Sequence, residues 1–435
     1  MNAKIASASS AALLQVLTRV RAKSIVLALV LVASQVAPAQ QFRVLYTFTN
    51  GRNGGTPSAG VTLDRVGNLY GTTASGGDLT CNAPNGCGTV FELANRNGNW
   101  ILNPLYTFVG GTDGAIPESR VIAGPNGDLY GTTLNGGGTG CGGSGCGTVF
   151  KLSPPPSACR TALCPWIETV LYRFTGGSDG SLPGYGDVVF DRAGNLYGTT
   201  SGGGAYGAGT VYELTSSGGS WTESVIYSLT GQSDGAEPLG GVVFDSSGNL
   251  YGTTTRGPGF QGSVFELSPS AGGWVETTLY DFVCGSGGGE VQSGVIVDSA
   301  GDLFGDTWPT GPGCGYGNVY ALAAGTFRVL YQFPPPSGGS GSGSGSTGSS
   351  LIMDSAGNLY DARLETPGPP VSAYPYGEIF ELVGQVGYLP LHEFTGGSDG
   401  AYPWEGPVMD ANGNLYGTAS AGGNGGYGVV WEITP

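Results

Sequence analysis

Histidine is the side chain most often used for acid–base catalysis near neutral pH, and this sequence contains one, His392. His392 stands in a recurring segment at a position where other copies have tyrosine, for example Tyr172 and Tyr227. We therefore interpret His392 as a packing residue. A Ser-His-Asp triad, a Cys-His pair and a histidine-based metal site then have no histidine to use. The sequence thus predicts no catalytic residue, no metal site and no cofactor.

Carboxylates could still act in pairs, because glycoside hydrolysis needs two carboxyl groups across a cleft. The sequence has 32 acidic residues, and no pair among them stands out. Glu92, Glu213, Glu266 and Glu381 recur at one place in the repeated unit, which favours a structural role. A polysaccharide-acting hydrolase or lyase therefore remains an alternative function.

Loops carry a second set of candidates, because binding residues are found more often on loops than on strands. Aspartates recur in loops that often read Gly-Gly-Ser/Thr-Asp-Gly: Asp113, Asp179, Asp234 and Asp399. Glycine-rich loops carry single aromatic residues, to which the divergent fifth copy adds a tryptophan: Tyr206, Phe260, Trp308, Tyr316 and Tyr427. Aromatic rings beside carboxylates suit a neutral or cationic ligand or a glycan. The alternative is that these residues only form turns and local packing.

The elements that position these loops are repeats of one motif. It occurs seven times, at residues 67–70, 127–130, 194–197, 248–251, 301–304, 357–360 and 413–416, and usually reads Gly-Asn-Leu-Tyr. Each copy has four short segments rich in Val, Tyr, Phe and Thr, which are typical of strands. We name them A, B, C and D in chain order; His392 falls in a D segment. The recurring aspartates lie in D–A loops, and the loop aromatics lie in B–C loops.

Many of these strands are apolar on both faces, as Val188-Val189-Phe190 shows. Such strands need neighbours on both sides, which a β-propeller supplies because each blade packs between two others. We therefore predict an all-β, seven-bladed propeller of four-stranded blades. The sequence begins its repeats with a lone D segment (44–48) and ends them with a C segment (429–433). The N-terminal strand is thus expected to complete the last blade and close the ring.

Each A–B turn has a local physical explanation. Six aspartates, among them Asp64 and Asp191, stand three residues before the turn glycine. Such an aspartate can accept a hydrogen bond from a backbone N–H two residues further on, and the glycine can adopt a positive φ. The second copy has Gly124 in place of the aspartate. A calcium site would need more oxygen ligands than this turn offers, so we interpret the motif as structural.

The stretch Gly194 to Thr200, Gly-Asn-Leu-Tyr-Gly-Thr-Thr, resembles the signature of the GloVer tandem-repeat family of exported bacterial proteins. Its A–B half is also similar to the repeat of NHL-type propellers. The resemblance covers residues 44–435. It implies an exported repeat protein and implies no reaction.

Residues 1–39 are predicted to be a signal peptide. A basic lead is followed by the apolar run 24–32, and Ala37-Pro38-Ala39 fits the small-x-small cleavage pattern. The apolar run is too short to span a bilayer, so we expect no membrane insertion. An uncleaved anchor is the alternative. We expect a secreted protein, periplasmic or extracellular, whose residues 40–435 form a single propeller domain.

The eight cysteines fit export, because they fall into neighbours that can form disulfides in an oxidising compartment. By proximity we predict the pairs Cys81–Cys87, Cys141–Cys146, Cys159–Cys164 and Cys284–Cys314. Zinc is the alternative, but the spacings are not C-x-x-C and no histidine lies nearby.

Charge restricts the partners. The formal charge is −16, and removal of residues 1–39, which hold four basic and no acidic residues, makes it −20. A chain so acidic is not expected to bind nucleic acid, which requires Lys and Arg to neutralise phosphates. We predict a monomeric, non-catalytic binding protein whose partner is a glycan or an extracellular protein. A purely structural surface module is a further alternative.

Overall fold

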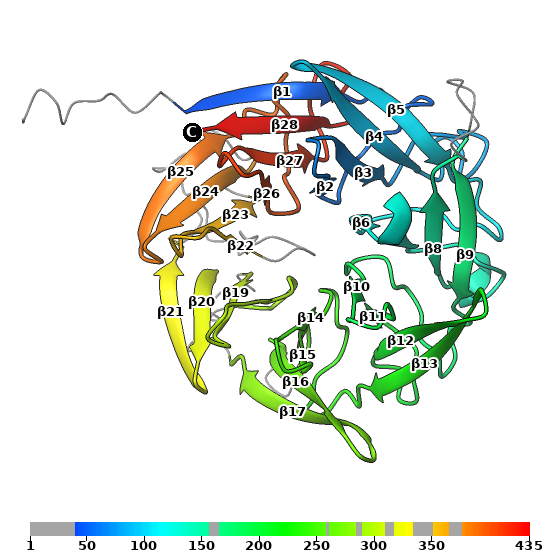
Figure 1. Cartoon of the computed structure of the whole chain (residues 1–435), viewed down its shortest axis with the longest axis vertical. Coiled ribbons are helices and arrows are strands. Elements are labelled where there is room, and N and C mark those ends of the chain that lie inside the picture. Colours follow the sequence, from blue (N-terminus) through cyan, green and yellow to red (C-terminus); the bar gives the residue numbers. More distant parts are fainter. Residues whose placement is uncertain are drawn as a thin grey trace, which may run out of the picture. The chain divides into compact units, whose positions relative to one another are not determined.

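Seven antiparallel sheets of four strands form a propeller ring within Phe42–Thr434 (Figure 1). The computed structural model describes residues 40–155, 165–257, 261–283, 289–308, 317–333, 351–364 and 376–435. These residues contain no α-helix and two short 3-10 turns, η1 (Pro125–Gly127) and η2 (Cys141–Gly143). No helix in this part of the chain is long and apolar enough to cross a membrane. The predicted all-β propeller is confirmed.

Every blade has the same strand order, from the inner A strand to the outer D strand. In that order the blades are β2 (Val61–Leu63), β3 (Leu69–Thr73), β4 (Thr89–Arg96), β5 (Asn99–Thr107); β6 (Ile122–Ala123), β7 (Leu129–Thr133), β8 (Thr148–Ser153), β9 (Ile167–Arg173); β10 (Val189–Phe190), β11 (Leu196–Thr200), β12 (Thr210–Ser217), β13 (Ser220–Ser228); β14 (Val243–Phe244), β15 (Leu250–Thr254), β16 (Ser263–Ser270), β17 (Gly273–Asp281); β18 (Ile296–Val297), β19 (Leu303–Thr307), β20 (Asn318–Ala323), β21 (Thr326–Gln332); β22 (Ile352–Met353), β23 (Leu359–Arg363), β24 (Glu378–Val383), β25 (Gly387–Glu393); and β26 (Val408–Met409), β27 (Leu415–Ala419), β28 (Val429–Thr434), β1 (Gln41–Thr47).

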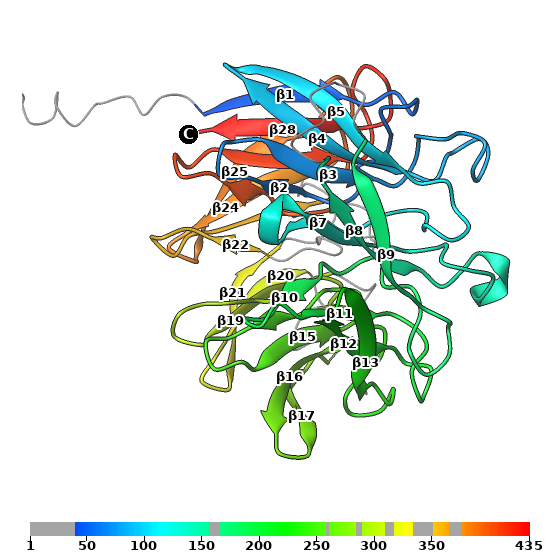
Figure 2. The same ribbon diagram turned by 45° about the vertical axis from the view of Figure 1, so that its right-hand side comes forward.

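The last blade takes its outer strand from the start of the chain, as predicted. β1 lies beside β28 in both views (Figures 1 and 2). The backbone N–H of Phe48 donates to the carbonyl of Gly428 at 2.9 Å, and Arg43 Nε donates to Glu432 Oε2 at 3.0 Å. Phe48 then packs in a buried cluster that joins the last blade to the first, with Tyr416 and Val430 on one side and Phe91 on the other. This strand closes the ring.

The Gly-Thr-Thr part of the repeat signature has a separate role for each residue. A Cβ on Gly71 would lie 2.6 Å from Cζ of Phe91, so glycine makes room for the ring on the neighbouring C strand. Thr72 Oγ1 donates to the carbonyl of Ser119 in the next blade at 3.0 Å. Thr73 Oγ1 lies 2.8 Å from Thr89 Oγ1 within its own blade. The motif therefore joins strands inside a blade and blades to each other.

The A–B turns form as the sequence predicts. Asp64 Oδ1 accepts hydrogen bonds from the backbone N–H groups of Val66 (2.9 Å) and Asn68 (2.8 Å). Gly67 has a φ of +88°, which favours glycine. The second blade, with Gly124 instead of aspartate, replaces this turn with η1. The described residues also hold no cluster of potential ligands that could bind a metal ion.

Candidate ligand pocket at the ring axis

A cavity of about 440 Å³ lies where the D–A loops of six blades meet. We call it the axial pocket, and its lining residues are Thr56, Ser58, Glu118, Tyr185, Leu239, Gln292 and Trp404. All seven are half-buried. The volume falls in the range of small-molecule sites, and aromatic or apolar walls with a few polar groups are typical of such sites.

The repeat places these side chains by one rule. Ser58, Glu118 and Tyr185 each stand three residues before a buried valine that begins the inner strand or directly precedes it (Val61, Val121, Val188). Leu239, Gln292 and Trp404 occupy the corresponding position in their own blades. The position is therefore structurally constant while its side chain differs from blade to blade. That combination gives a symmetric ring an asymmetric pocket.

The loops that present these residues contain backbone strain at a repeated place. The residue before the loop proline has a positive φ in five blades: Thr56 (54°), Ile116 (58°), Leu182 (59°), Glu237 (56°) and Tyr402 (58°). Such values are unfavourable for side chains with a Cβ and cost on the order of 1–2 kcal/mol per residue. Strain of this kind is often found at functional sites, where the surrounding structure holds it in place.

Hydrogen bonds from the preceding blade hold the strained residues. The N–H of Ile116 donates to the carbonyl of Cys87 at 2.9 Å, and the N–H of Leu182 donates to the carbonyl of Cys146 at 2.9 Å. Both acceptors belong to B–C loops closed by disulfides, Cys81–Cys87 and Cys141–Cys146, which confirms two predicted pairs. The other two predicted pairs, Cys159–Cys164 and Cys284–Cys314, lie outside the described residues. Each observed disulfide thus stabilises the loop that supports the next blade's pocket residue.

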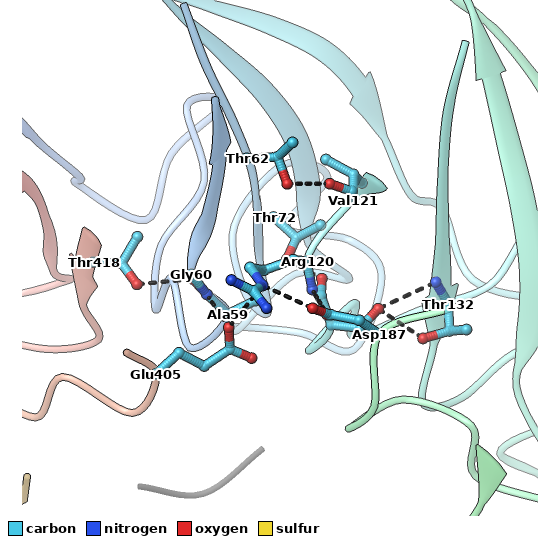
Figure 3. Close-up of polar contacts among 11 residues, drawn as sticks. Ala59, Gly60, Thr62, Thr72, Arg120, Val121, Thr132, Asp187, Glu405 and Thr418 are labelled. Carbon is cyan, nitrogen blue, oxygen red and sulfur yellow. Dashed lines mark hydrogen bonds and ion pairs between the residues drawn. The ribbon is translucent and has the colours of Figure 1, made fainter. Parts of the chain in front are cut away.

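Three charged side chains lie together beside the axial pocket, and we call Arg120, Asp187 and Glu405 the charged trio (Figure 3). Arg120 Nε donates to Asp187 Oδ2 at 2.7 Å and lies 3.4 Å from Glu405 Oε2. The backbone N–H of Arg120 donates to Asp187 Oδ1 at 2.8 Å, and that of Gly60 donates to Glu405 Oε2 at 2.7 Å. Residues from four blades therefore meet here.

The buried carboxyl group of this trio has unusual acidity. Glu405 is 2 % exposed, and its burial together with the charge of Asp187 raises its pKa to about 8. The pKa of Arg120 is also raised, because the attraction of Asp187 and Glu405 outweighs the opposing effect of burial. The arginine therefore stays charged and keeps its partner Asp187, while burial favours the protonated form of Glu405.

The axial pocket itself holds a carboxyl group with a perturbed pKa. Burial raises the pKa of Glu118, and none of the described residues forms a hydrogen bond to its carboxylate. The pKa of Tyr185 is raised by burial and by the charge of Glu118. These two side chains therefore influence each other electrostatically inside the axial pocket.

A second, apolar cavity of about 290 Å³ includes Arg120 and Asp187 in its wall. Most of its other lining residues are aliphatic and come from the inner strands and the residues just before them: Ile122, Val188, Val189, Val242, Val243, Ile296, Leu351 and Ile352. Arg120 and Asp187 of the charged trio thus lie at the edge of an apolar cavity.

The four aspartates predicted as ligand contacts hold their own D–A loops. Asp179 Oδ2 accepts from Tyr172 Oη (3.1 Å) and from the N–H of Thr175 (2.8 Å). Asp113, Asp234 and Asp399 make the corresponding contacts, and Asp399 bonds His392 Nε2 at 3.2 Å in place of a tyrosine. His392 also stacks on Phe42 with ring centroids 3.5 Å apart. None of these aspartates lines the axial pocket.

The three predicted aromatic contacts that the structure describes, Tyr206, Trp308 and Tyr427, do not line the axial pocket. Tyr206 and Tyr427 are 66 % and 41 % exposed on their B–C loops. The backbone N–H of Trp308 donates to the carbonyl of Glu290 at 2.7 Å. Phe260 and Tyr316 lie outside the described residues.

Sequence reasoning missed the axial pocket and the charged trio, although a signal was present. Where Arg120 and Asp187 stand, four other blades have glycine: Gly60, Gly241, Gly294 and Gly406. Glu405 likewise occupies a place held by Ala59, Ser119, Gly240 and Ser293. Charged residues in positions that the repeat otherwise keeps small indicate a site, once the copies are aligned on their inner strands.

Comparison with solved structures finds distant similarities. A provisionally assigned 6-phosphogluconolactonase from Bacteroides uniformis is 14% identical, with 77% of this chain and 84% of that chain covered and a TM-score of 0.46. A provisionally assigned oxidoreductase (glucose dehydrogenase) from Thermus thermophilus is 13% identical, with 91% and 99% covered and a TM-score of 0.38. A luciferin-regenerating enzyme is 11% identical, with 91% and 95% covered and a TM-score of 0.40. Similarities this distant assign no activity.

Comparison by sequence is more informative about the family. No curated protein matches the chain. The sequence model of the Gloeobacter/Verrucomicrobia repeat matches residues 32–184 and 143–363, which together cover more than half of the chain. The matched regions contain the Gly-Asn-Leu-Tyr-Gly-Thr-Thr signature at 194–200. The chain therefore belongs to the Gloeobacter/Verrucomicrobia repeat family.

Proposed function

We propose that this propeller is a non-catalytic binding protein that takes the end of a glycan into the axial pocket. One observation carries the proposal: six blades each place a different side chain in one cavity, and together these side chains offer aromatic faces and hydrogen-bonding groups. Trp404 and Tyr185 can stack on the apolar face of a sugar ring. Glu118 and Gln292 can bond its hydroxyl groups.

Tyr206 and Tyr427 are proposed as outer contacts for a longer glycan, because both residues are exposed. We infer that the protein acts as a monomer, since β1 already pairs with β28 and closes the ring. We also infer a periplasmic or extracellular location, which the two disulfides support because such bonds persist in oxidising compartments. N-terminal sequencing of the exported protein would test the cleavage after Ala39.

Affinity electrophoresis tests the binding proposal directly. The protein from Gln40 onward would be run on native gels that contain plant or bacterial polysaccharides. Retardation by at least one polymer is expected, and Trp404→Ala should reduce affinity about tenfold or more, because a central aromatic contact is lost. Val66→Ala is a matched control, since Val66 is 79 % exposed and outside the axial pocket. Unchanged mobility with every polymer would contradict the proposal.

A polysaccharide hydrolase or lyase is a second candidate, favoured by the charged trio. A carboxyl group that keeps its proton near neutral pH can act as a general acid, and an arginine beside it can stabilise negative charge. Binding ranks first because Glu405 is almost fully buried and does not line the axial pocket. Incubation with a retained polymer, followed by chromatography of the products, would separate the two. Cleavage that Glu405→Gln abolishes would support the enzyme.

A further inference from the structure

The axial pocket has an acidic lining. Among its described lining residues, Glu118 is the one carboxylate and none is a lysine or an arginine. The Glu118 carboxylate has no hydrogen-bond partner among the described residues, and its burial penalises an unpaired negative charge. A positively charged group beside Glu118 would remove that penalty. A neutral group would remove only part of it.

The charged groups beside the axial pocket also have a net negative charge. The charged trio and Glu118 together present three carboxyl groups against one guanidinium, and that guanidinium is already paired with Asp187 at 2.7 Å. When Glu405 keeps its proton, two carboxylates still face one arginine. The whole chain is also acidic, with a formal charge of −16. The local field therefore favours a cation and opposes an anion.

The walls of the axial pocket add a second attraction of the same kind. The faces of tryptophan and tyrosine carry negative charge density and attract cations within about 6 Å of the ring centre. Trp404 and Tyr185 supply two such rings to the same cavity as Glu118. Ser58, Thr56 and Gln292 complete the lining with hydrogen-bonding groups, which a purely apolar cation would leave unused.

We propose that the axial pocket selects a sugar unit that carries a protonated primary amine, with the ammonium group paired to Glu118 between the rings of Trp404 and Tyr185. This inference rests on the proposed glycan-binding function and names its ligand class. The ammonium pairs with the carboxylate, the aromatic rings stack on the sugar, and the hydroxyl groups of the sugar bond Thr56 and Gln292. Acetylation of the amine would remove the charge and add bulk, so acetylated sugars bind more weakly.

Calorimetry with three matched β-1,4-linked oligomers of equal length tests the inference: glucosamine, N-acetylglucosamine and glucose oligomers. Titration at pH 6 keeps the amine protonated. All three oligomers are measured at the same moderate salt concentration. The glucosamine oligomer is expected to bind at least tenfold more tightly than the other two. Equal affinities, or a preference for an uncharged oligomer, would overturn the inference and leave glycan binding in place. No binding by any of the three would overturn both.

Two variants distinguish the effect of Glu118 on the amine preference from the effect of the protein's overall charge. Glu118→Gln keeps the size of the side chain and removes its charge, so it should abolish the preference for the amine while the glucose oligomer still binds. Asp78→Asn removes one charge from an exposed loop outside the axial pocket and should leave the preference intact. A preference that survives in Glu118→Gln would overturn the assignment of Glu118. Circular dichroism of each variant would verify folding.

Discussion

The carbonyl of Cys87 in the first blade accepts a hydrogen bond of 2.9 Å from the N–H of Ile116 in the second blade. Ile116 has a φ of +58°, and Glu118 enters the axial pocket two residues later. The disulfide Cys81–Cys87 therefore constrains the loop that holds a strained residue next to the axial pocket. The same relation links Cys146, Leu182 and Tyr185 in the following blade.

Removal of this disulfide should affect stability and binding together. In Cys81→Ser/Cys87→Ser, loss of a short cross-linked loop should lower the free energy of unfolding by about 2 kcal/mol. Affinity for a retained glycan should fall as well, because Ile116 and Glu118 become less well fixed. Denaturant titration and affinity electrophoresis would measure the two effects. A variant that loses stability but binds with unchanged affinity would show that the disulfide does not support the axial pocket.

Titration of Glu405 should make stability depend on pH. Its pKa is raised from the ordinary value of 4.5 to about 8, so between these values the folded protein holds a proton that the unfolded chain has released. The free energy of unfolding should therefore fall as pH rises from about 4.5 to about 8. Denaturant titrations across this range would measure the slope.

Glu405→Gln is the matched variant for this measurement. Its amide oxygen can still accept from the N–H of Gly60, but it has no proton to release. Glu168 and Glu223, whose pKa values are raised to about 7, contribute slopes of the same sign that remain in the variant. The variant should thus lose part of the pH dependence and be more stable than the original protein at pH 8. An unchanged slope would mean that Glu405 does not titrate in this range.

The ring and its turns could be predicted because each repeat carries its own local explanation. Asp64 and Gly67 specify a turn through contacts within five residues, and the same pair recurs along the chain. Disulfides between neighbours, such as Cys141–Cys146, follow from proximity in the sequence. Closure by β1 followed from counting strands in the first and last copies.

The axial pocket could not be predicted in the same way, because its residues are distant in sequence and meet when the ring closes. Arg120 and Glu405 are an example, since a 3.4 Å contact joins the second blade to the seventh. The aspartates chosen from the sequence, such as Asp179, recur because they stabilise loops. Repeated positions thus belong to residues with structural roles, whereas departures from the repeat, such as Arg120 among glycines, lie at the candidate site.

The glycine of the Gly-Thr-Thr motif should be intolerant of a methyl group. In Gly71→Ala the new Cβ would lie 2.6 Å from Cζ of Phe91 and force this buried ring to move. Overpacking of this kind should cost about 1–3 kcal/mol in the free energy of unfolding. Gly272→Ala is the control, since a Cβ there meets no atom within 4 Å. Equal stability of the two variants in denaturant titration would refute this explanation of the motif.

Closure of the ring by the N-terminal strand makes Phe48 a critical residue for stability. Its fully buried ring contacts Phe91 with centroids 5.3 Å apart and shares a cluster with Tyr416 and Val430 of the last blade. Phe48→Ala should therefore lower the free energy of unfolding by about 3–5 kcal/mol, as expected for a cavity in a core. Val66→Ala, at an exposed site, should have almost no effect. If denaturant titration gave similar values for both variants, the ring would not depend on β1 for closure, and pairing between β1 and β28 would have to contribute little to stability.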